Sequence, residues 1–218
     1  MNLDIQEVVA EAHERCHHDP QMITGYQLET TIRSLNLMFV EWSVRGINYW
    51  KVDEQFIQLA QGANEYQLPE DTIDILRMVI RRSNVDTTMA RISLTEFQEL
   101  PNKPDQGKPQ QFFLDRRIQP KIFIFQSAEN STDTLVYRRV AQIDAAVDSE
   151  LTADADVPQR WYEAMCGGLA AKLAWKLPKV DKELRDDLIV AAEVSFGFAS
   201  GDERERATLR ITPVTALS

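Results

Sequence analysis

Cysteine, histidine and glycine are scarce in this sequence of 218 residues, and their scarcity excludes several classes of protein. The two cysteines, Cys16 and Cys166, are far apart and lie in helical contexts. We expect free thiols in a reducing compartment, with one long-range disulfide as the minority alternative. All three histidines fall within residues 13–18, which leaves none to activate a nucleophile elsewhere. With no Gly-x-Ser-x-Gly motif and no glycine-rich phosphate loop, we expect no enzyme, no catalytic residue, no cofactor and no bound metal.

Long apolar runs are absent as well. The longest uncharged run in the most apolar predicted helix is residues 164–171, far short of the ~20 residues that span a bilayer. The first residues, MNLDIQEVVAEAHERC, carry acids where a signal peptide needs an apolar core. We therefore expect a soluble intracellular product with no membrane partner.

The histidine cluster HERCHH offers one alternative function. His13 and His17 are spaced i, i+4 on a predicted helix beside Cys16, a geometry that can hold zinc. A fourth ligand is missing unless Glu14 or Asp19 supplies it. An exposed helix end is the simpler interpretation, and a metal-dependent nuclease-type enzyme is the alternative.

Basic residues are outnumbered, because 24 Lys and Arg face 34 Asp and Glu, for a net charge of −10. Residues 74–143 hold eleven basic and eight acidic residues, so the rest of the chain carries a net charge of −13. This acidity argues against tight sequence-independent binding to DNA, which depends on Lys and Arg. Within the predicted strands, however, three pairs stand out: Arg81-Arg82, Arg116-Arg117 and Arg138-Arg139.

Successive residues of a strand face opposite ways, so each arginine pair places one side chain on each face. The pairs could protect sheet edges and form salt bridges with the acidic segments. They could also bind acidic neighbours or nucleic acid, and a DNA-binding regulator is therefore a second alternative function.

The two ends of the chain predict helices. Segments 3–18, 24–45 and about 180–198 have helical periodicity, and a further helix follows Asp156 and Pro158, with Asp156 as its cap. The helix at 24–45 has one apolar face and Thr24 as its N-cap. Gly167 and Gly168 lie inside the helix after Pro158, where each costs about 1 kcal/mol, so we expect another backbone to pack closely there.

The middle of the chain predicts strands at 73–82, 111–117, 121–126 and 134–141. Residues 48–69 predict a hairpin with a turn at 62–64. Pro69 cannot donate to a sheet and forces Leu68 to be extended, so Leu68-Pro69 predicts a corner, followed by one turn of tight helix at 70–72. The proline-rich segment 101–110 predicts a surface loop that orders against a partner.

Together these patterns predict an α+β fold. Residues 1–46 and 155–200 form a helical bundle body, and residues 47–154 form an inserted antiparallel β-rich module, barrel-like or sandwich-like. Residues 201–218 form an extended C-terminal tail. The expected structural core residues are Trp42, Leu68, Pro69, Trp161 and Met165.

Four stretches carry a resemblance to a known family: YQLPEDTIDILR (66–77), FLDRRIQPKI (113–122), LVYRR (135–139) and VPQRWYEAMCGGLAAKLA (157–174). In this order the chain resembles the head-to-tail adaptor family of short-tailed bacteriophages, portal-docking connectors similar to tail tubular protein A. The resemblance covers about residues 25–200 and rests on structural patterns. The segment around His13–His18 has no counterpart in it.

The resemblance implies a structural protein of the virion, assembled in the bacterial host cytoplasm. It implies a homo-oligomeric ring, a dodecamer, that docks under the portal protein and lines the exit channel, with transient contact to passing double-stranded DNA. The portal-binding residues it implies are Arg204, Arg206, Leu209, Arg210, Ile211 and Pro213. The residues it implies for contact with the downstream tail or nozzle protein are Pro101, Lys103, Pro104, Lys108 and Pro109.

Overall fold

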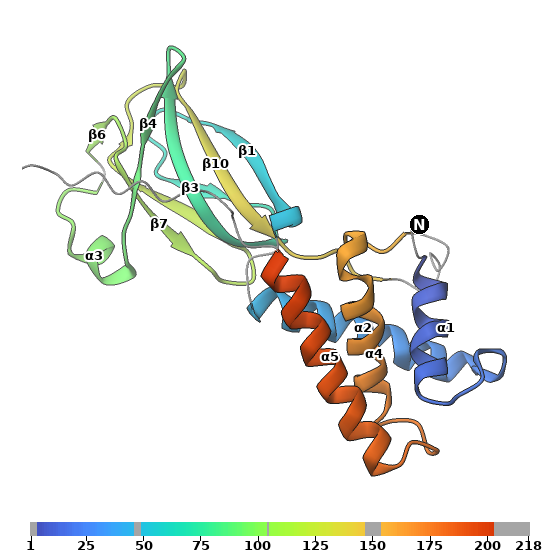
Figure 1. The fold of residues 1–218 in the computed structure, drawn as a ribbon. Coiled ribbons are helices and arrows are strands. Elements are labelled where there is room, and N and C mark those ends of the chain that lie inside the picture. The colour runs from blue at the N-terminus through green and yellow to red at the C-terminus, as the bar shows by residue number, and fades with distance from the viewer. Residues whose placement is uncertain (1–3, 46–48, 104, 147–153, 203–218) are drawn as a thin grey trace, which may run out of the picture.

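The computed structural model describes residues 4–45, 49–103, 105–146 and 154–202. Helices from both ends of the chain pack together, and the strands form a separate lobe (Figure 1). The α+β class predicted from the sequence is confirmed. The helices are α1 (Ile5–Arg15), α2 (Gly25–Arg45), α3 (Leu94–Glu99), α4 (Tyr162–Leu173) and α5 (Lys182–Asp202), with the short 3-10 helices η1 (Pro20–Met22), η2 (Tyr49–Lys51) and η4 (Gln159–Trp161). The strands are β1 (Val52–Gln58), β2 (Glu65–Gln67), β3 (Thr72–Arg82), β4 (Val85–Thr88), β5 (Ala90–Arg91), β6 (Gln106–Gly107), β7 (Gln111–Asp115), β8 (Lys121–Phe125), β9 (Ser127–Ala128) and β10 (Thr134–Ala141).

Local capping sets where the helices begin. Asp4 caps α1 in a reciprocal capping box with Glu7, so this helix is shorter than the predicted 3–18. Thr24 caps α2 as predicted, because its Oγ1 accepts a hydrogen bond from the backbone N–H of Gln27. Asp156 does not cap the next helix. Its carboxylate instead accepts bonds from Lys51 Nζ at 2.6 Å and from the N–H of Asp144.

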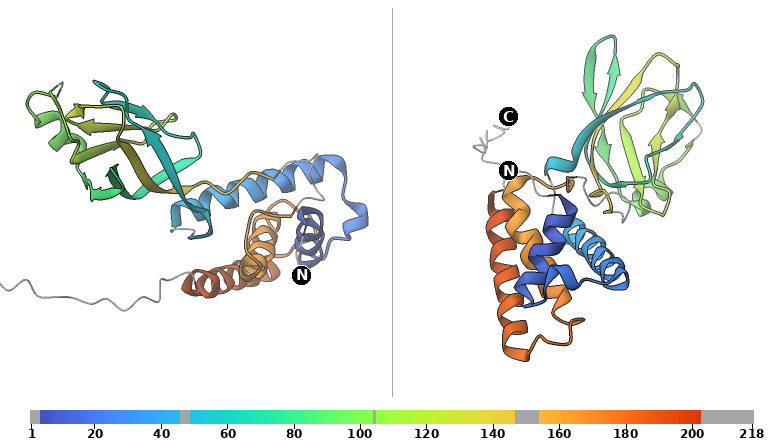
Figure 2. Two further views of the ribbon diagram at one scale, coloured as in Figure 1. Left: turned by 90° about the horizontal axis from the view of Figure 1, so that it is seen from above. Right: turned by 90° about the vertical axis from the view of Figure 1, so that its right-hand side faces the viewer.

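The helical domain is built around α4, which contacts α1, α2 and α5. Both views of Figure 2 place α4 between α5 and α2. The buried side chains of these helices form one hydrophobic core, separate from that of the strands. Trp42, Trp161 and Met165 are buried in it.

The β-rich lobe has two four-stranded sheets, ordered β1-β10-β3-β4 and β2-β8-β7-β5, and a small β6-β9 pair. The described strands do not close into a barrel. Most pairs are antiparallel as predicted, but β5-β7 and β6-β9 are parallel. Residues from both larger sheets, among them Ile80, Leu135, Ile122 and Ile124, are buried in one core between them.

The hairpin predicted for residues 48–69 is wrong. β1 pairs with β10, and β2 pairs with β8 in the other sheet. The corner at Leu68-Pro69 therefore carries the chain from one sheet to the other. Leu68 N–H bonds to Pro120 O, and the N–H of Thr72, where β3 begins, bonds to Pro69 O in a turn rather than a helix.

Assignment of Pro69 to the structural core is also wrong. Leu68 is buried in the core of the β-rich lobe, whereas Pro69 is exposed, because it sits at the outside of the turn. The sequence analysis missed α3, which begins at a capping box between Ser93 and Glu96.

Candidate assembly surfaces of the helical domain

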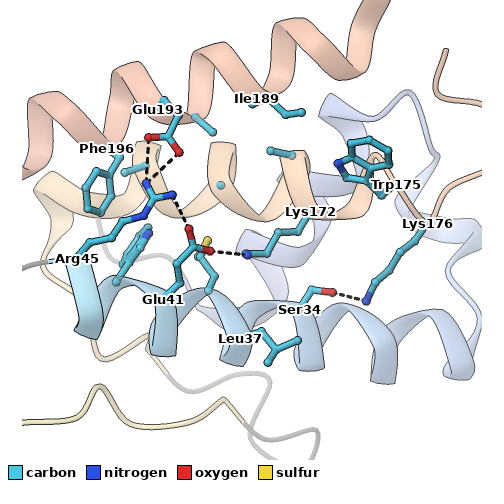
Figure 3. A pocket seen from close by; sticks show the side chains of 16 residues that line it. Ser34, Leu37, Glu41, Arg45, Lys172, Trp175, Lys176, Ile189, Glu193 and Phe196 are labelled. Atoms are coloured by element: carbon cyan, nitrogen blue, oxygen red, sulfur yellow. Dashed lines mark hydrogen bonds and ion pairs between the residues drawn. The ribbon is translucent and has the colours of Figure 1, made fainter. Parts of the chain in front are cut away.

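A groove runs along the helical domain between α2 and α5, with α4 as its floor (Figure 3). Its volume is about 410 Å³. The floor is formed by small residues of α4, Ala164, Gly168 and Ala171. A Cβ atom on Gly168 would lie 2.7 Å from Met38 Sδ of α2, and one on Gly167 would lie 3.7 Å from the Cα of Ala192 of α5. Gly168 thus leaves room for the side chain of Met38, whereas at Gly167 the distance to the α5 backbone is an ordinary van der Waals contact, so the unusually close backbone predicted at these glycines is not what the packing shows.

Ion pairs line the groove. Glu41 accepts hydrogen bonds from Lys172 at 2.7 Å and from Arg45, and the bond from Lys172 lowers the pKa of the Glu41 carboxyl. Arg45 also donates to both carboxylate oxygens of Glu193, each at 2.9 Å, and these bonds raise the pKa of Arg45. These side chains are partly exposed, so the pairs contribute little to stability and mainly orient the groove walls.

An aromatic cluster closes one end of the groove. The ring of Trp161 lies 5.0 Å from that of Trp42, 5.0 Å from that of Trp50 and 5.4 Å from that of Phe196. Trp50 belongs to η2, just before the first strand, and its Nε1 donates to Asp156 O at 3.3 Å. The cluster therefore joins α2, η4 and α5 and also anchors the start of the β-rich lobe.

One side of α2 has no partner within the described part of the chain. Its exposed residues recur every three or four positions, which places them on one stripe. We call this stripe the α2 face, and it consists of Tyr26, Glu29, Arg33, Leu37, Val40 and Val44. A hollow of about 460 Å³ lies on it, lined only by α2 residues.

The outward side of α5 is equally bare. Of this 21-residue helix only Ala199 is buried. The exposed stripe that points away from α4 is called the α5 face, and it consists of Glu183, Asp186, Asp187, Val190, Val194 and Phe198. Gly197 and Gly201 lie on the same side, and a Cβ atom on either would meet nothing within 4 Å. Two aliphatic helix faces exposed in this way are typical of interaction surfaces.

The N-terminal half of the α5 face is acidic, whereas that of the α2 face carries both Glu29 and Arg33. Arg33 makes no ion pair with any described residue, and it lies near Lys176. Burial lowers the pKa of the Lys176 ammonium, and repulsion from Arg33 and Lys172 lowers it further. On the α5 face, the carboxylates of Glu183, Asp186 and Asp187 likewise lack ion pairs among the described residues.

The arginine pairs of the β-rich lobe are used in ion pairs within that lobe. The pairs are Arg81 with Asp86, Arg82 with Glu129 and Asp133, Arg116 with Asp74, Arg117 with Asp115, Arg138 with Glu54, and Arg139 with Asp53 and Asp71. Salt bridging with acidic segments was predicted, and the acids that form these ion pairs lie in the β-rich lobe itself. The arginines of the three pairs are therefore held by carboxylates of their own lobe, which leaves less free positive charge for nucleic acid.

The histidine segment is not the exposed helix end that the sequence predicted. His13 is 1% exposed, and its Nε2 lies 3.0 Å from Thr31 Oγ1 while its Nδ1 lies 3.2 Å from His18 Nδ1. Burial, followed by the nearby His18 ring, lowers the pKa of His13 to about 4. Cys16 is buried and donates its thiol to Ala170 O. Among the residues that the structure describes, no three His, Cys, Asp or Glu converge to hold a metal.

The predicted tail-protein contact segment at 101–110 has hydrogen bonds of its own. Lys103 Nζ donates to the backbone oxygens of Gln98 and Leu100, and Lys108 Nζ donates to Thr87 Oγ1 at 2.8 Å. Pro101 is exposed and Pro109 is buried, while Pro104 lies outside the described residues. The segment adjoins α3 and β6, at the end of the β-rich lobe remote from the helices (Figure 1).

The predicted portal-binding residues, Arg204, Arg206, Leu209, Arg210, Ile211 and Pro213, lie outside the described residues. The two exposed helix faces and the anchoring role of Trp50 were not anticipated. The spacing of Leu37, Val40 and Val44 was a usable signal, because a second apolar stripe on an amphipathic helix indicates a second partner.

Comparison with known proteins gives two matches. The chain is 25% identical to the chaperone protein ClpB of Dichelobacter nodosus over 189 aligned residues. The aligned region makes up 82% of this chain but only 20% of ClpB. The chain thus spans about a fifth of the length of this curated relative, and the identity is too low to show a shared family.

In the described segments, no helix has the length and apolarity needed to cross a bilayer.

The second match is to a family model, that of the SU10 adaptor protein, and it spans residues 5–211. It includes all four helices of the helical domain and the whole β-rich lobe. The resemblance to phage adaptors stated from the sequence is therefore confirmed, and the chain belongs to the SU10 adaptor protein family, a family of phage head-to-tail adaptors.

Proposed function

We propose that the chain forms a dodecameric ring that docks under the portal, connects it to the downstream tail or nozzle protein and lines the DNA exit channel of the virion. The observation that carries this proposal is the family match over residues 5–211. The two exposed helix faces support it, because a ring needs two different contact surfaces on every subunit. We assign the chain no enzymatic activity.

We place the portal contact in the tail that follows α5. Arg204 and Arg206 come first there, and Arg210 lies between Leu209 and Ile211, ahead of Pro213. A segment of this composition can add a strand to the edge of a partner's sheet, where backbone hydrogen bonds supply affinity and side chains supply specificity.

We place the contact with the downstream tail protein at the end of the β-rich lobe remote from the helices. The segment from Pro101 to Pro109 lies there beside α3, and its bonds from Lys103 and Lys108 hold it in one shape. A preformed surface loses less conformational entropy on binding than a loop that must first be ordered.

The acidity of the chain suits a channel through which DNA passes. A basic wall would gain affinity for each phosphate it neutralised, whereas a surface with a net charge of −10 per chain gains none. Because the six arginines of the three pairs are held by carboxylates, contact with double-stranded DNA is expected to be transient and non-specific.

The test is the native mass of the purified protein, alone and after mixing with the portal of the same phage. Ring-sized particles in either sample support the proposal, and the pair of samples shows whether the portal templates the ring. A protein that stays monomeric in both samples at high concentration contradicts it. Absence of a ring together with chelator-sensitive nuclease activity would favour the enzyme alternative instead.

A further inference from the structure

The α2 and α5 faces divide into matching halves. On each helix the N-terminal half of the face is polar and charged, and the C-terminal half is apolar. Val40 and Val44 continue the α2 face, while Val190 and Val194 continue the α5 face. Apolar surface therefore occurs over the same half of both helices.

Contacts across the groove show that these halves lie at the same level. Near one end Arg45 of α2 bonds to Glu193 of α5 and lies over the ring of Phe196. Towards the other end Ser34 of α2 bonds to Lys176, which follows Trp175. The guanidinium of Arg185 of α5 lies over the ring of Trp175.

These contacts indicate that both helices run in the same general sense along the groove, and the bond from Arg45 to Glu193 matches positions of α2 and α5 that are about 150 residues apart in the sequence. Counted from that bond, Val40 corresponds to Val190, Val44 to Val194 and Arg33 to Glu183. The two faces of one subunit do not meet each other, because α2 and α5 both pack against α4, which lies between them (Figure 2), and the residues of the two faces are exposed.

We propose that the α2 face of one copy of this chain docks on the α5 face of the next copy, an inference that rests on the ring proposed above. A rotation about an axis along the helices brings residues of equal level together. Val40 then meets Val190, and the unpaired Arg33 meets the unpaired carboxylates around Glu183. The hollow of about 460 Å³ on the α2 face receives side chains of the neighbouring α5.

Complementary charges favour a second copy over an unrelated partner. Arg33 and the neighbouring Lys176 outnumber Glu29 at this part of α2, so the region favours an acidic surface, and the acidic start of α5 favours a basic one. Each subunit supplies both. Since the two surfaces differ, the contact is heterologous, and repetition of a heterologous contact closes into a ring when the rotation permits.

Cross-linking between introduced cysteines tests the contact. The variant carries Val40→Cys and Val190→Cys in the full chain, and a short bismaleimide is added at high protein concentration, with and without the portal. The native Cys16 and Cys166 are buried, and burial raises the pKa of each thiol to about 11, so they react slowly. The matched control pairs Val40→Cys with Val85→Cys, because Val85 of β4 and Val190 are both 63% exposed.

A ladder of covalent oligomers from the Val40/Val190 variant, and none from the Val40/Val85 control, is the expected result. A covalent dimer from Val40→Cys alone would show a symmetric α2–α2 contact and overturn the proposal. Cross-linking of Val40→Cys to the portal instead would also overturn it. If rings form without the ladder, only this interface is wrong, whereas the absence of rings in both samples removes the proposed ring itself.

Mixing two broken subunits gives a second readout. Val40→Asp disables only the α2 face and Val190→Asp disables only the α5 face, so neither variant alone should assemble. Together they retain one intact α2 face and one intact α5 face. We expect the mixture to form a heterodimer by native mass; two monomers from this mixture, with wild-type rings under the same conditions, would contradict the proposed contact.

Discussion

Replacement of Trp161 by alanine should destabilise the helical domain strongly. Trp161 is 2% exposed and contacts the rings of Trp42, Trp50 and Phe196. Truncation of a buried tryptophan to alanine costs roughly 3–5 kcal/mol. Each aromatic pair adds about 0.5–1.5 kcal/mol beyond its buried area, so the loss should fall in the upper part of that range.

The matched control is Trp175→Ala, which removes the same side chain at a site that is 67% exposed. Trp175 contributes the stacking of Arg185 over its ring, an interaction of about 0.5–1 kcal/mol at an exposed site. Urea unfolding is followed by far-UV circular dichroism, whose helical signal reports on this domain. Both variants are measured at one protein concentration, because assembly would stabilise the folded state.

A loss under about 1 kcal/mol for Trp161→Ala, or a loss equal to that of Trp175→Ala, would refute the reasoning. It would mean that the site relaxes to fill the space or that the aromatic cluster does not hold the helices together. A large loss with Trp161→Ala but unchanged melting of the β-rich lobe would show that the two hydrophobic cores unfold separately.

Three further predictions concern packing, pH and the tail. Gly168→Ala should lower the free energy of unfolding in urea by roughly 1–3 kcal/mol, because the new methyl group would clash with Met38. Gly197→Ala should instead raise it by up to about 1 kcal/mol, because a methyl group there meets open space and alanine favours the helix. Equal effects of the two substitutions would contradict this packing. The pKa of His13 is about 4 in the folded chain, below its ordinary value, so the unfolded chain binds more protons between about pH 6.5 and 4. Stability should therefore fall as the pH drops through that window, by up to roughly 3 kcal/mol, and His13→Gln should flatten the pH profile of the unfolding midpoint. Deletion of residues 203–218 should leave the circular dichroism and melting unchanged but abolish co-sedimentation with the portal, and an unfolded truncation would place the tail in the core.

Local signals in the sequence predicted the helices well. The core side of α2 was visible because its apolar residues repeat with the helical period, and Thr24 marked its start. The corner at Leu68-Pro69 was visible because proline restricts both its own backbone and the residue before it. In each case the physical cause lies within a few residues of its effect.

Strand pairing could not be predicted in the same way. Gly62 adopts a left-handed conformation and makes a turn, which suggested that the strands on either side pair with each other. β1 instead pairs with β10, which follows it by about 80 residues, so that Val136 lies opposite Phe56. Such pairing depends on which faces are buried across the whole lobe, and no short window of sequence contains that information.

The candidate site shows the same division. Gly167 and Gly168 predicted close helix packing, but not that one faces α5 and the other α2. Leu37, Val40 and Val44 looked like part of an ordinary apolar helix. Helices α1 and α4 and the segment at Ala146 pack on the other sides of α2, and only this arrangement shows that the stripe is left uncovered.

The small residues of α4 connect the packing of one subunit to the geometry of the assembly. Because Gly168 leaves room for Met38, α2 lies close against α4, and the directions of the outer helices depend on this packing more than on the exposed ion pairs across the groove. The angle between the α2 and α5 faces follows from those directions. In a heterologous ring that angle determines how many copies close the circle. Gly168, which costs α4 intrinsic helix stability, therefore occupies a position where a larger side chain would disturb folding and, in the proposed ring, the angle between the two contact faces.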